Sequence, residues 1–310
     1  MMEWALHVKG VQEVEGIGLL KGGPRPGRPG PLDFVQVESR KVIEELFGRI
    51  AFSRVYFGNE FCQHLIPSRD SLARIYSAAQ RKGLAFTLLT PYVTDEGIER
   101  LKPLFDFLAD GKGGPEVVVN DWGVLRLLRR EHPSLTPVLG RLMNKMLRDP
   151  LATAYYALHA LTPKPALSAL RRSNLTVPVY RAFLKGSGIT MVEVDNVVQG
   201  IDMNLKEMGL SGALYIPYGF VATGRICLFA SLNQPKEKKF TVSTTCSKEC
   251  QRHSAECSSH EAPFKGNPFM LLHRGNTVFY PQGKNLLRSV LLHAEAKGIM
   301  RIIYQPQIPM

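Results

Sequence analysis

The feature that most constrains the fold of this chain is its alternation of short apolar segments with longer segments of helical periodicity. The short segments are rich in β-branched and aromatic residues, and the longer ones repeat apolar residues every three or four positions. This spacing is typical of βα units, which build a mainly parallel sheet covered by helices. A barrel of eight such units needs about 250 residues, and the chain has 310. We therefore predict an α/β fold whose sheet is either open or closed into a barrel.

The same pattern places the individual elements. The predicted strands cover residues 32–37, 54–57, 84–89, 116–119, 135–139, 190–194 and 212–216. The predicted helices cover residues 41–50, 68–82, 95–109, 122–130 and 202–207. Asp121 stands directly before the fourth of these helices, where an aspartate side chain accepts hydrogen bonds from the first helical N–H groups. We expect it to cap that helix rather than to act in catalysis.

Residues 1–31 are expected to form a tail and linker outside the α/β domain. Residues 22–31 read GGPRPGRPGP, a run that favours neither a helix nor a central strand. The α/β domain is then predicted to span residues 32–310. Within it, residues 231–268 are rich in Lys, Ser, Thr, Cys and His and have little apolar periodicity. Such an excursion has no core of its own, and a metal centre is one way to order it.

Composition and charge narrow the class of protein. Apolar residues make up 45% and charged residues 21%, which excludes general disorder. The formal net charge is +12 at pH 7, so nucleic acid, anionic metabolites and acidic proteins are candidate partners. No segment has the pattern of a membrane-spanning helix or of a secretory signal. We therefore expect a cytoplasmic protein with no transmembrane segment, whose reduced cysteines suit metal binding better than disulfides.

The five cysteines carry most of the functional information. Cys62 lies just beyond a predicted strand, Cys227 follows the strand at 212–216, and the other three lie in the polar excursion. A local zinc site is one interpretation, because zinc takes four Cys or His ligands. Its candidate ligands are Cys246, Cys250, His253, Cys257 and His260. An iron–sulfur cluster held by thiolates from separate segments is the second interpretation, and unligated thiols are the third. Spacing alone leaves all three open, although the local zinc site gives Cys62 and Cys227 no role.

Four segments resemble a known family. They read VYFGNEFC at residues 55–62, VVVNDWGV at 117–124, GRIC at 224–227 and LLHRGNTV at 271–278. With the CxxxC at residues 246–250, their order is similar to that in UbiV-like proteins of peptidase family U thirty-two, the collagenase-like peptidase family. The resemblance covers about residues 52–280. UbiV-like proteins are iron–sulfur proteins of oxygen-independent ubiquinone hydroxylation, one step of ubiquinone biosynthesis.

The resemblance implies a fold, a cofactor and a partner. The implied fold is an irregular TIM-like barrel, here with a cluster-binding segment at residues 227–257, and the implied partner is a UbiU-like subunit. The implied cofactor is one [4Fe–4S] cluster, whose ligands fall on Cys62, Cys227, Cys246 and Cys250. Cys257 is additional to the family pattern, and Glu60 stands one position away from the family's glutamate. A zinc ion remains the alternative cofactor.

The implied chemistry is a hydroxylation that takes its oxygen from a donor other than O2, with a small aromatic or carboxylate substrate. An acidic donor needs a cationic partner, and a guanidinium binds a carboxylate through two parallel hydrogen bonds. The candidates for substrate binding are Arg225, Arg141 and Lys145, with Asn120 at the carboxyl end of a predicted strand. No residue is assigned a catalytic role.

Three other functions stay open. Modification of an RNA base, within the same family, predicts basic residues gathered on one face beside aromatic side chains, whereas the sequence shows scattered pairs such as Arg129 and Arg130. Nucleic acid is therefore not the favoured partner. A peptidase is suggested by the family name, but the sequence has no Ser/His/Asp or Cys/His arrangement of recognisable spacing. The last alternative is a non-enzymatic protein whose polar excursion is stabilised by bound zinc and which binds a partner protein.

Overall fold

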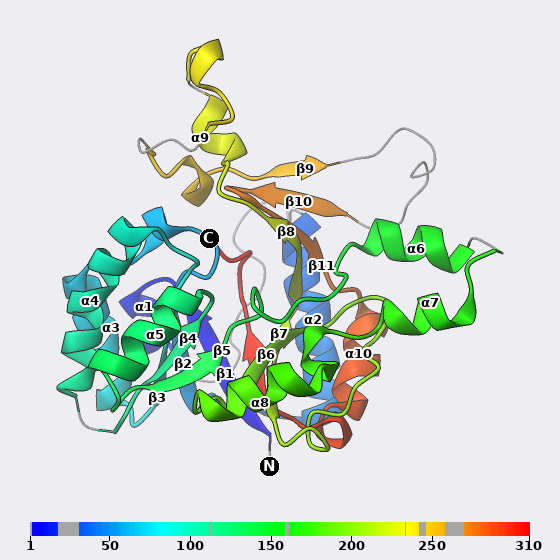
Figure 1. The fold of residues 1–310 in the computed structure, drawn as a ribbon, viewed down its shortest axis with the longest axis horizontal. Coiled ribbons are helices and arrows are strands. Elements are labelled where there is room, and N and C mark those ends of the chain that lie inside the picture. The colour runs from blue at the N-terminus through cyan, green and yellow to red at the C-terminus, as the bar shows by residue number, and fades with distance from the viewer. Residues whose placement is uncertain are drawn as a thin grey trace.

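The computed structural model describes residues 2–17, 31–111, 113–158, 161–232, 234–241, 246–257 and 270–310. Eight strands close into a barrel, and a separate four-stranded sheet lies above one end of it (Figure 1). The barrel strands are β1 (Glu3–Val8), β2 (Arg54–Gly58), β3 (Ala85–Leu89), β4 (Glu116–Val119), β5 (Thr136–Leu139), β6 (Met191–Asp195), β7 (Ser211–Ile216) and β12 (Ile299–Tyr304). The second sheet contains β8 (Tyr218–Thr223), β9 (Ala255–Cys257), β10 (Leu271–Arg274) and β11 (Thr277–Pro281).

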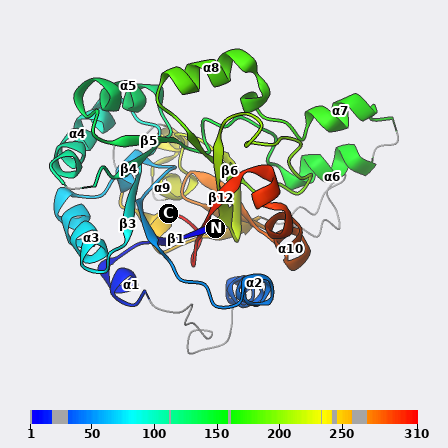
Figure 2. The same ribbon diagram turned by 90° about the horizontal axis from the view of Figure 1, so that it is seen from below.

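The helices complete the βα units. They are α1 (Val11–Glu15), α2 (Pro31–Phe47), α3 (Arg69–Arg81), α4 (Asp95–Ala109), α5 (Trp122–Glu131), α6 (Pro150–Leu158), α7 (Lys164–Ala169), α8 (Pro178–Gly186), α9 (Leu228–Leu232) and α10 (Lys284–His293). Seen along the barrel, α3, α4, α5 and α8 lie outside the ring of strands (Figure 2). Asp121 caps α5 as predicted, because its Oδ1 accepts hydrogen bonds from the backbone N–H groups of Gly123 and Val124.

All neighbouring strands of the barrel are parallel, in the order β1-β12-β7-β6-β5-β4-β3-β2. β1 closes the ring because it pairs with β12 on one side and with β2 on the other. The predicted α/β fold is therefore confirmed, and of the two predicted forms of the sheet the closed barrel is the observed one.

The barrel strands direct alternate side chains to two environments. In β2, Val55 and Phe57 pack in the core between strands and helices, whereas Tyr56 packs with residues of the barrel interior. At the amino end of the barrel, Arg301 donates a hydrogen bond to the Tyr56 hydroxyl at 2.7 Å and another to Glu116 at 2.6 Å. This buried polar layer occupies the amino end of the barrel interior. A functional site is therefore expected at the carboxyl end, where barrel enzymes build their active sites.

The second sheet covers the carboxyl end of the barrel. It is antiparallel, in the order β8-β11-β10-β9, and β8 follows β7 after a single residue. Ile308 and Met310 pack in one apolar cluster with Phe220 of β8 and Phe279 of β11. Phe61, from the loop after β2, belongs to the same cluster, so the cluster joins the second sheet to the barrel.

The prediction that residues 1–31 form a tail outside the α/β domain was wrong for the first part of this segment. Residues 3–8 form β1, an integral strand of the barrel, and α1 follows it. Trp4 and Leu6 face the helical layer, but Glu3 and His7 interrupt the apolar pattern, so this strand has a weak signal in the sequence. Most of the predicted linker falls at residues 18–30, which lie outside the described residues.

Two further predicted elements were wrong. Residues 32–37 belong to α2 rather than to a strand, because their apolar residues fit both periods and a proline at position 31 suits the first turn of a helix. Residues 202–207 form an irregular segment that leads into a turn rather than a helix. The Asn204 side chain there accepts a hydrogen bond from the backbone N–H of Lys206 at 3.1 Å, an interaction that competes with helical hydrogen bonding.

The remaining predicted elements are confirmed to within one or two residues at their ends, and the predicted helix at 41–50 falls largely within α2. In the part of the chain that the structure describes, no helix is both long and apolar enough to cross a membrane.

Candidate metal centre and adjoining pockets

Four of the five cysteines line one small cavity. They are Cys62, Cys227, Cys246 and Cys250, hereafter the four cavity cysteines. They come from the loop after β2, from the residue before α9, and from the segment around a short 3-10 helix at Glu249–Gln251. Cys257, on β9, is exposed and does not line this cavity. All five are free thiols, so no disulfide links them.

The loop after β2 holds Cys62 by side-chain hydrogen bonds. The Asn59 Oδ1 atom accepts hydrogen bonds from the backbone N–H groups of Phe61 at 2.9 Å and Cys62 at 2.8 Å. The loop begins at Gly58, whose φ of 121° is rarely adopted by other residues. A Cβ at Gly58 would also overlap the backbone carbonyl of Leu89. The direction of the loop therefore depends on this glycine.

Asn276 ties two of the cysteine loops together. It lies in the turn between β10 and β11, and its Nδ2 donates hydrogen bonds to the carbonyl oxygens of Phe61 at 2.7 Å and Gly224 at 2.5 Å. Phe61 directly precedes Cys62, and Gly224 stands three residues before Cys227. Asn276 thus fixes both segments from one side chain.

Arg274 holds the third cysteine segment. Its Nε donates a hydrogen bond to the Cys250 carbonyl at 2.7 Å, and its Nη2 donates to the Gln251 carbonyl at 3.0 Å. Neither Arg274 nor Asn276 stood out in the sequence, because both act through backbone atoms of residues distant in the chain. The only signal was their place in the segment LLHRGNTV, which carries part of the family resemblance.

Burial and the neighbouring thiols raise the pKa of three of the cavity cysteines. Burial, followed by the neighbouring thiols, raises the pKa of Cys62 to about 11 and that of Cys250 to about 12. Burial likewise raises the pKa of Cys227. These thiols therefore keep their protons at neutral pH unless a cation is bound. A metal centre binds thiolates, so its assembly at this cavity would release protons.

The donor set fits a multi-iron cluster. Backbone N–H groups point at two of the sulfurs: the Ala230 nitrogen lies 3.4 Å from Cys227 Sγ, and the Lys248 nitrogen lies 3.4 Å from Cys246 Sγ. Hydrogen bonds of this kind to the sulfurs tune iron–sulfur clusters. Each thiolate of a four-iron cluster binds its own iron, so four soft ligands spread around one cavity are the arrangement it needs.

The local zinc interpretation receives no such support. Among the residues that the structure describes, no three His, Cys, Asp or Glu side chains are grouped closely enough to hold one metal ion, and this includes the four cavity cysteines. Cys246, Cys250, His253 and Cys257 are all described, and His260 lies outside the described residues.

A pocket of about 680 Å³ adjoins the cysteine cavity. Its lining combines aromatic residues (Tyr92, Trp122 and Phe220) with cationic residues (Lys145, Arg148 and Arg225). Arg225 lines both this pocket and the cysteine cavity, and its guanidinium lies 5.8 Å from the centre of the Tyr92 ring. The volume and the mixed lining suit a small aromatic or anionic ligand. We call this space the Arg225 pocket.

Three of the four predicted substrate-binding residues line the Arg225 pocket: Asn120, Lys145 and Arg225. The Asn120 amide is engaged in the fold, since its Nδ2 donates to the Thr90 carbonyl at 2.9 Å and its Oδ1 accepts from the Leu142 N–H at 3.0 Å. Burial, followed by the nearby Arg148, lowers the pKa of Lys145.

Arg141 does not line the pocket, because it is fully buried in an ion-pair network. It donates two hydrogen bonds to Glu60, at 3.0 and 2.8 Å, and one to Asp195 at 2.8 Å. Arg148 donates to the other oxygen of Asp195 at 2.7 Å. Glu60 stands two residues before Cys62, so the network supports the cysteine loop from the barrel interior. Sequence reasoning did not pair these residues, which are more than 40 positions apart.

A shallow hollow of about 400 Å³ lies on the other side of Trp122. Arg126, Arg129 and Arg130 of α5 line it together with Phe183 of α8. The Trp122 and Phe183 rings meet edge to face with centroids 5.3 Å apart, and each side chain is about half exposed. The fold therefore places aromatic rings beside basic residues that are scattered in the sequence. We call this surface the α5 arginine groove.

Comparisons with known proteins assign no family to the chain. No protein-family model matches it, and no curated protein matches it. Among solved structures, it is similar to the U32 peptidase Mk0906, with a TM-score of 0.42 and 10% identity over 100% of this chain and 95% of that one. It is also similar to a glycoside hydrolase family 18 N-acetylglucosaminidase from Paenibacillus barengoltzii, with a TM-score of 0.29 and 9% identity over 98% and 94% of the two chains. A GH18 chitinase from Cycas revoluta gives a TM-score of 0.29 and 10% identity over the same shares. Similarities this distant carry no functional argument, and the barrel assignment rests on the strand pairing itself.

Proposed function

We propose that the chain is an iron–sulfur protein of the UbiV-like type, which holds one [4Fe–4S] cluster on the four cavity cysteines and takes part in an oxygen-independent hydroxylation. One observation carries the proposal: thiols from three segments up to 188 residues apart, Cys62 to Cys250, line a single cavity. These are the same four positions that the family resemblance implies, and the additional Cys257 lies elsewhere.

The Arg225 pocket is the proposed substrate site. When bound, the cluster would supply electron transfer or a binding site for an oxygen donor. Arg225, which lines both spaces, would orient an anionic group at their junction through charge-assisted hydrogen bonds. Tyr92, Trp122 and Phe220 would pack against an aromatic ring, and Lys145 would add positive charge at the rim of the pocket.

The proposal includes a UbiU-like partner subunit and a cytoplasmic location, where thiols stay reduced until the cluster assembles. A zinc ion on the same or neighbouring cysteines is the alternative cofactor, and metal analysis of the purified protein distinguishes the two.

The function is tested by deleting the gene in the source organism and growing the strain without oxygen. Ubiquinone-type quinones and their unhydroxylated precursors are measured by mass spectrometry, in parallel with modified nucleosides from total RNA. We expect a precursor lacking a ring hydroxyl to accumulate and to disappear on complementation with the wild-type gene. Cys227→Ser should fail to complement, whereas Cys257→Ser, the matched control, should succeed. Unaltered quinones in the deletion strain would refute the hydroxylation of quinones.

RNA modification is the second candidate function, and the α5 arginine groove favours it. Basic side chains beside half-exposed aromatic rings are what single-stranded nucleic acid binds, through phosphate contacts and base stacking. Trp122 also lines the Arg225 pocket, so a nucleic-acid strand bound in the groove would run past the opening of that pocket. The loss of a hydroxylated nucleoside in the same deletion strain, with unaltered quinones, would support this candidate.

A further inference from the structure

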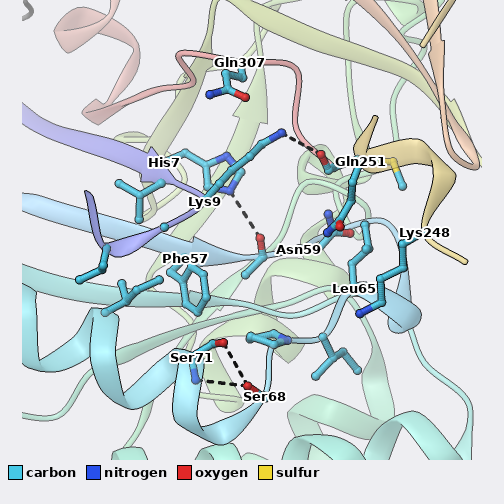
Figure 3. A pocket seen from close by; sticks show the side chains of 18 of the residues that line it. His7, Lys9, Phe57, Asn59, Leu65, Ser68, Ser71, Lys248, Gln251 and Gln307 are labelled. Carbon is cyan, nitrogen blue, oxygen red and sulfur yellow. Dashed lines mark hydrogen bonds between the residues drawn. The ribbon is translucent and has the colours of Figure 1, made fainter. Parts of the chain in front are cut away.

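A second pocket, of about 550 Å³, adjoins the cysteine cavity. It opens at the carboxyl ends of β1 and β2, and Leu65 and Met310 line both this pocket and the cysteine cavity. In the view of Figure 3, His7 and Lys9 lie on one side of the pocket and Leu65 and Lys248 on the other. We call it the Lys9 pocket.

The charged side chains that line the Lys9 pocket are all cationic. Its cationic lining residues are Lys9, Arg74, Lys248 and Arg274, and no Asp or Glu is among the described residues that line it. Lys9 and Arg274 donate hydrogen bonds to backbone carbonyls near the C-terminus and in the cysteine segment. Arg74 and Lys248 are exposed and form no ion pair with any described residue. Their charges are therefore available to a ligand.

Two buried polar side chains in the lining retain hydrogen-bonding capacity. Asn59 is 5% exposed; its Oδ1 holds the cysteine loop, while its Nδ2 has no hydrogen-bond partner among the described residues. His7 is also 5% exposed, and its one hydrogen-bond contact with the described residues is a 3.5 Å approach of Nε2 to the Gly58 carbonyl. Both side chains can therefore form a further hydrogen bond at this pocket, which suits a ligand with a polar group.

The rest of the lining sets the kind of ligand. Phe57, Leu65, Ile66 and Ile75 supply apolar surface, and the Ser68 and Ser71 hydroxyls lie at the floor in the view of Figure 3. A pocket of this volume takes a molecule of metabolite size rather than a bare ion.

We propose that the Lys9 pocket binds a small anionic metabolite, whose carboxylate or phosphate group lies between Arg74 and Lys248 and whose apolar part contacts Phe57 and Ile75. This site is separate from the Arg225 pocket and does not depend on the proposed function. Lys248 lies between Cys246 and Cys250, so a bound anion would contact the segment that carries two of the cavity cysteines.

The test is isothermal titration calorimetry of the anaerobically purified full-length protein with three ring-matched probes: phenyl phosphate, benzoate and the neutral benzyl alcohol. We expect the anionic probes to bind and the alcohol not to bind at millimolar concentration. Arg74→Gln and Lys248→Gln should each weaken binding about five- to tenfold, since each removes one charge-assisted contact. Lys82→Gln, which removes an exposed charge at the other end of α3, is the matched control and should bind like the wild type.

Tighter binding of phenyl phosphate would identify a phosphate ester as the ligand class, and tighter binding of benzoate a carboxylate. No binding of either anion, or equal affinity in the wild type and both glutamine variants, would overturn the proposal. The iron content of the same preparations is measured separately, so failure of this site and failure of the cluster proposal are distinguishable.

Discussion

Acid should destabilise this protein through His7 in particular. The side chain is buried at the carboxyl end of β1, and burial, followed by the nearby charges of Lys9 and Arg141, lowers its pKa from 6.5 to about 3. Below pH 6.5 His7 therefore binds a proton in the unfolded chain but stays neutral in the folded protein. The free energy of unfolding therefore decreases progressively as the pH falls from 6.5 towards 3.

The size of the effect follows from the shift. At about pH 4.5, roughly two units below the ordinary pKa, the penalty is about 2.7 kcal/mol, since each unit corresponds to about 1.36 kcal/mol. The variant His7→Gln is neutral at every pH and lacks this term. We expect urea unfolding to show that the free energy of unfolding falls by about 2.5 kcal/mol more in the wild type than in His7→Gln between pH 7 and about pH 4.5.

The comparison between the two proteins removes the contribution of the carboxylates, which titrate in both. An equal loss of stability in the wild type and His7→Gln would refute the assignment of a buried, neutral His7.

Three further substitutions test other parts of the structure. Arg141→Met leaves the buried Glu60 without its cation and Asp195 with Arg148 alone, and should lower the free energy of unfolding by about 3–5 kcal/mol in urea; a loss under 1 kcal/mol would contradict the buried network. Asp121→Ala removes the cap of α5 and should cost about 1 kcal/mol in the same assay, and an unchanged midpoint would contradict the cap. Gly275→Ala forces a Cβ into a residue with φ of 62°, 3.2 Å from the Cys250 Cβ, and should reduce both stability, by about 1–3 kcal/mol, and bound iron; a variant with wild-type stability and iron content would contradict that close packing.

Much of the fold is predictable from the sequence because most barrel strands are short apolar runs flanked by turn residues. Residues 116–119, for example, read EVVV and are followed by Asn120 and the capping Asp121, so both the strand and the helix after it have strong local signals. β1 has a weaker signal, since the polar residues Glu3 and His7 interrupt its apolar pattern. α2 was partly misassigned because a six-residue apolar segment satisfies both periods, and only the helix packing around it decides between them.

The site was predictable only in part. The resemblance pointed to four cysteines, and the structure brings those four to one cavity. Asn276 holds two cysteine loops together by hydrogen bonds to their backbone carbonyls, and no sequence pattern predicts such contacts. The α5 arginine groove also escaped notice, because Phe183 reaches the α5 arginines only through the packing of α8 against α5.

The most direct test of the central claim is the iron and acid-labile sulfide content of anaerobically purified protein, compared between Cys62→Ser and Cys257→Ser. We predict about four irons and four sulfides per chain in the wild type and in Cys257→Ser, and a loss of most of both in Cys62→Ser. Stoichiometric zinc in the wild type, retained in Cys62→Ser and lost in Cys257→Ser, would contradict the claim that distant cysteines share one iron–sulfur centre.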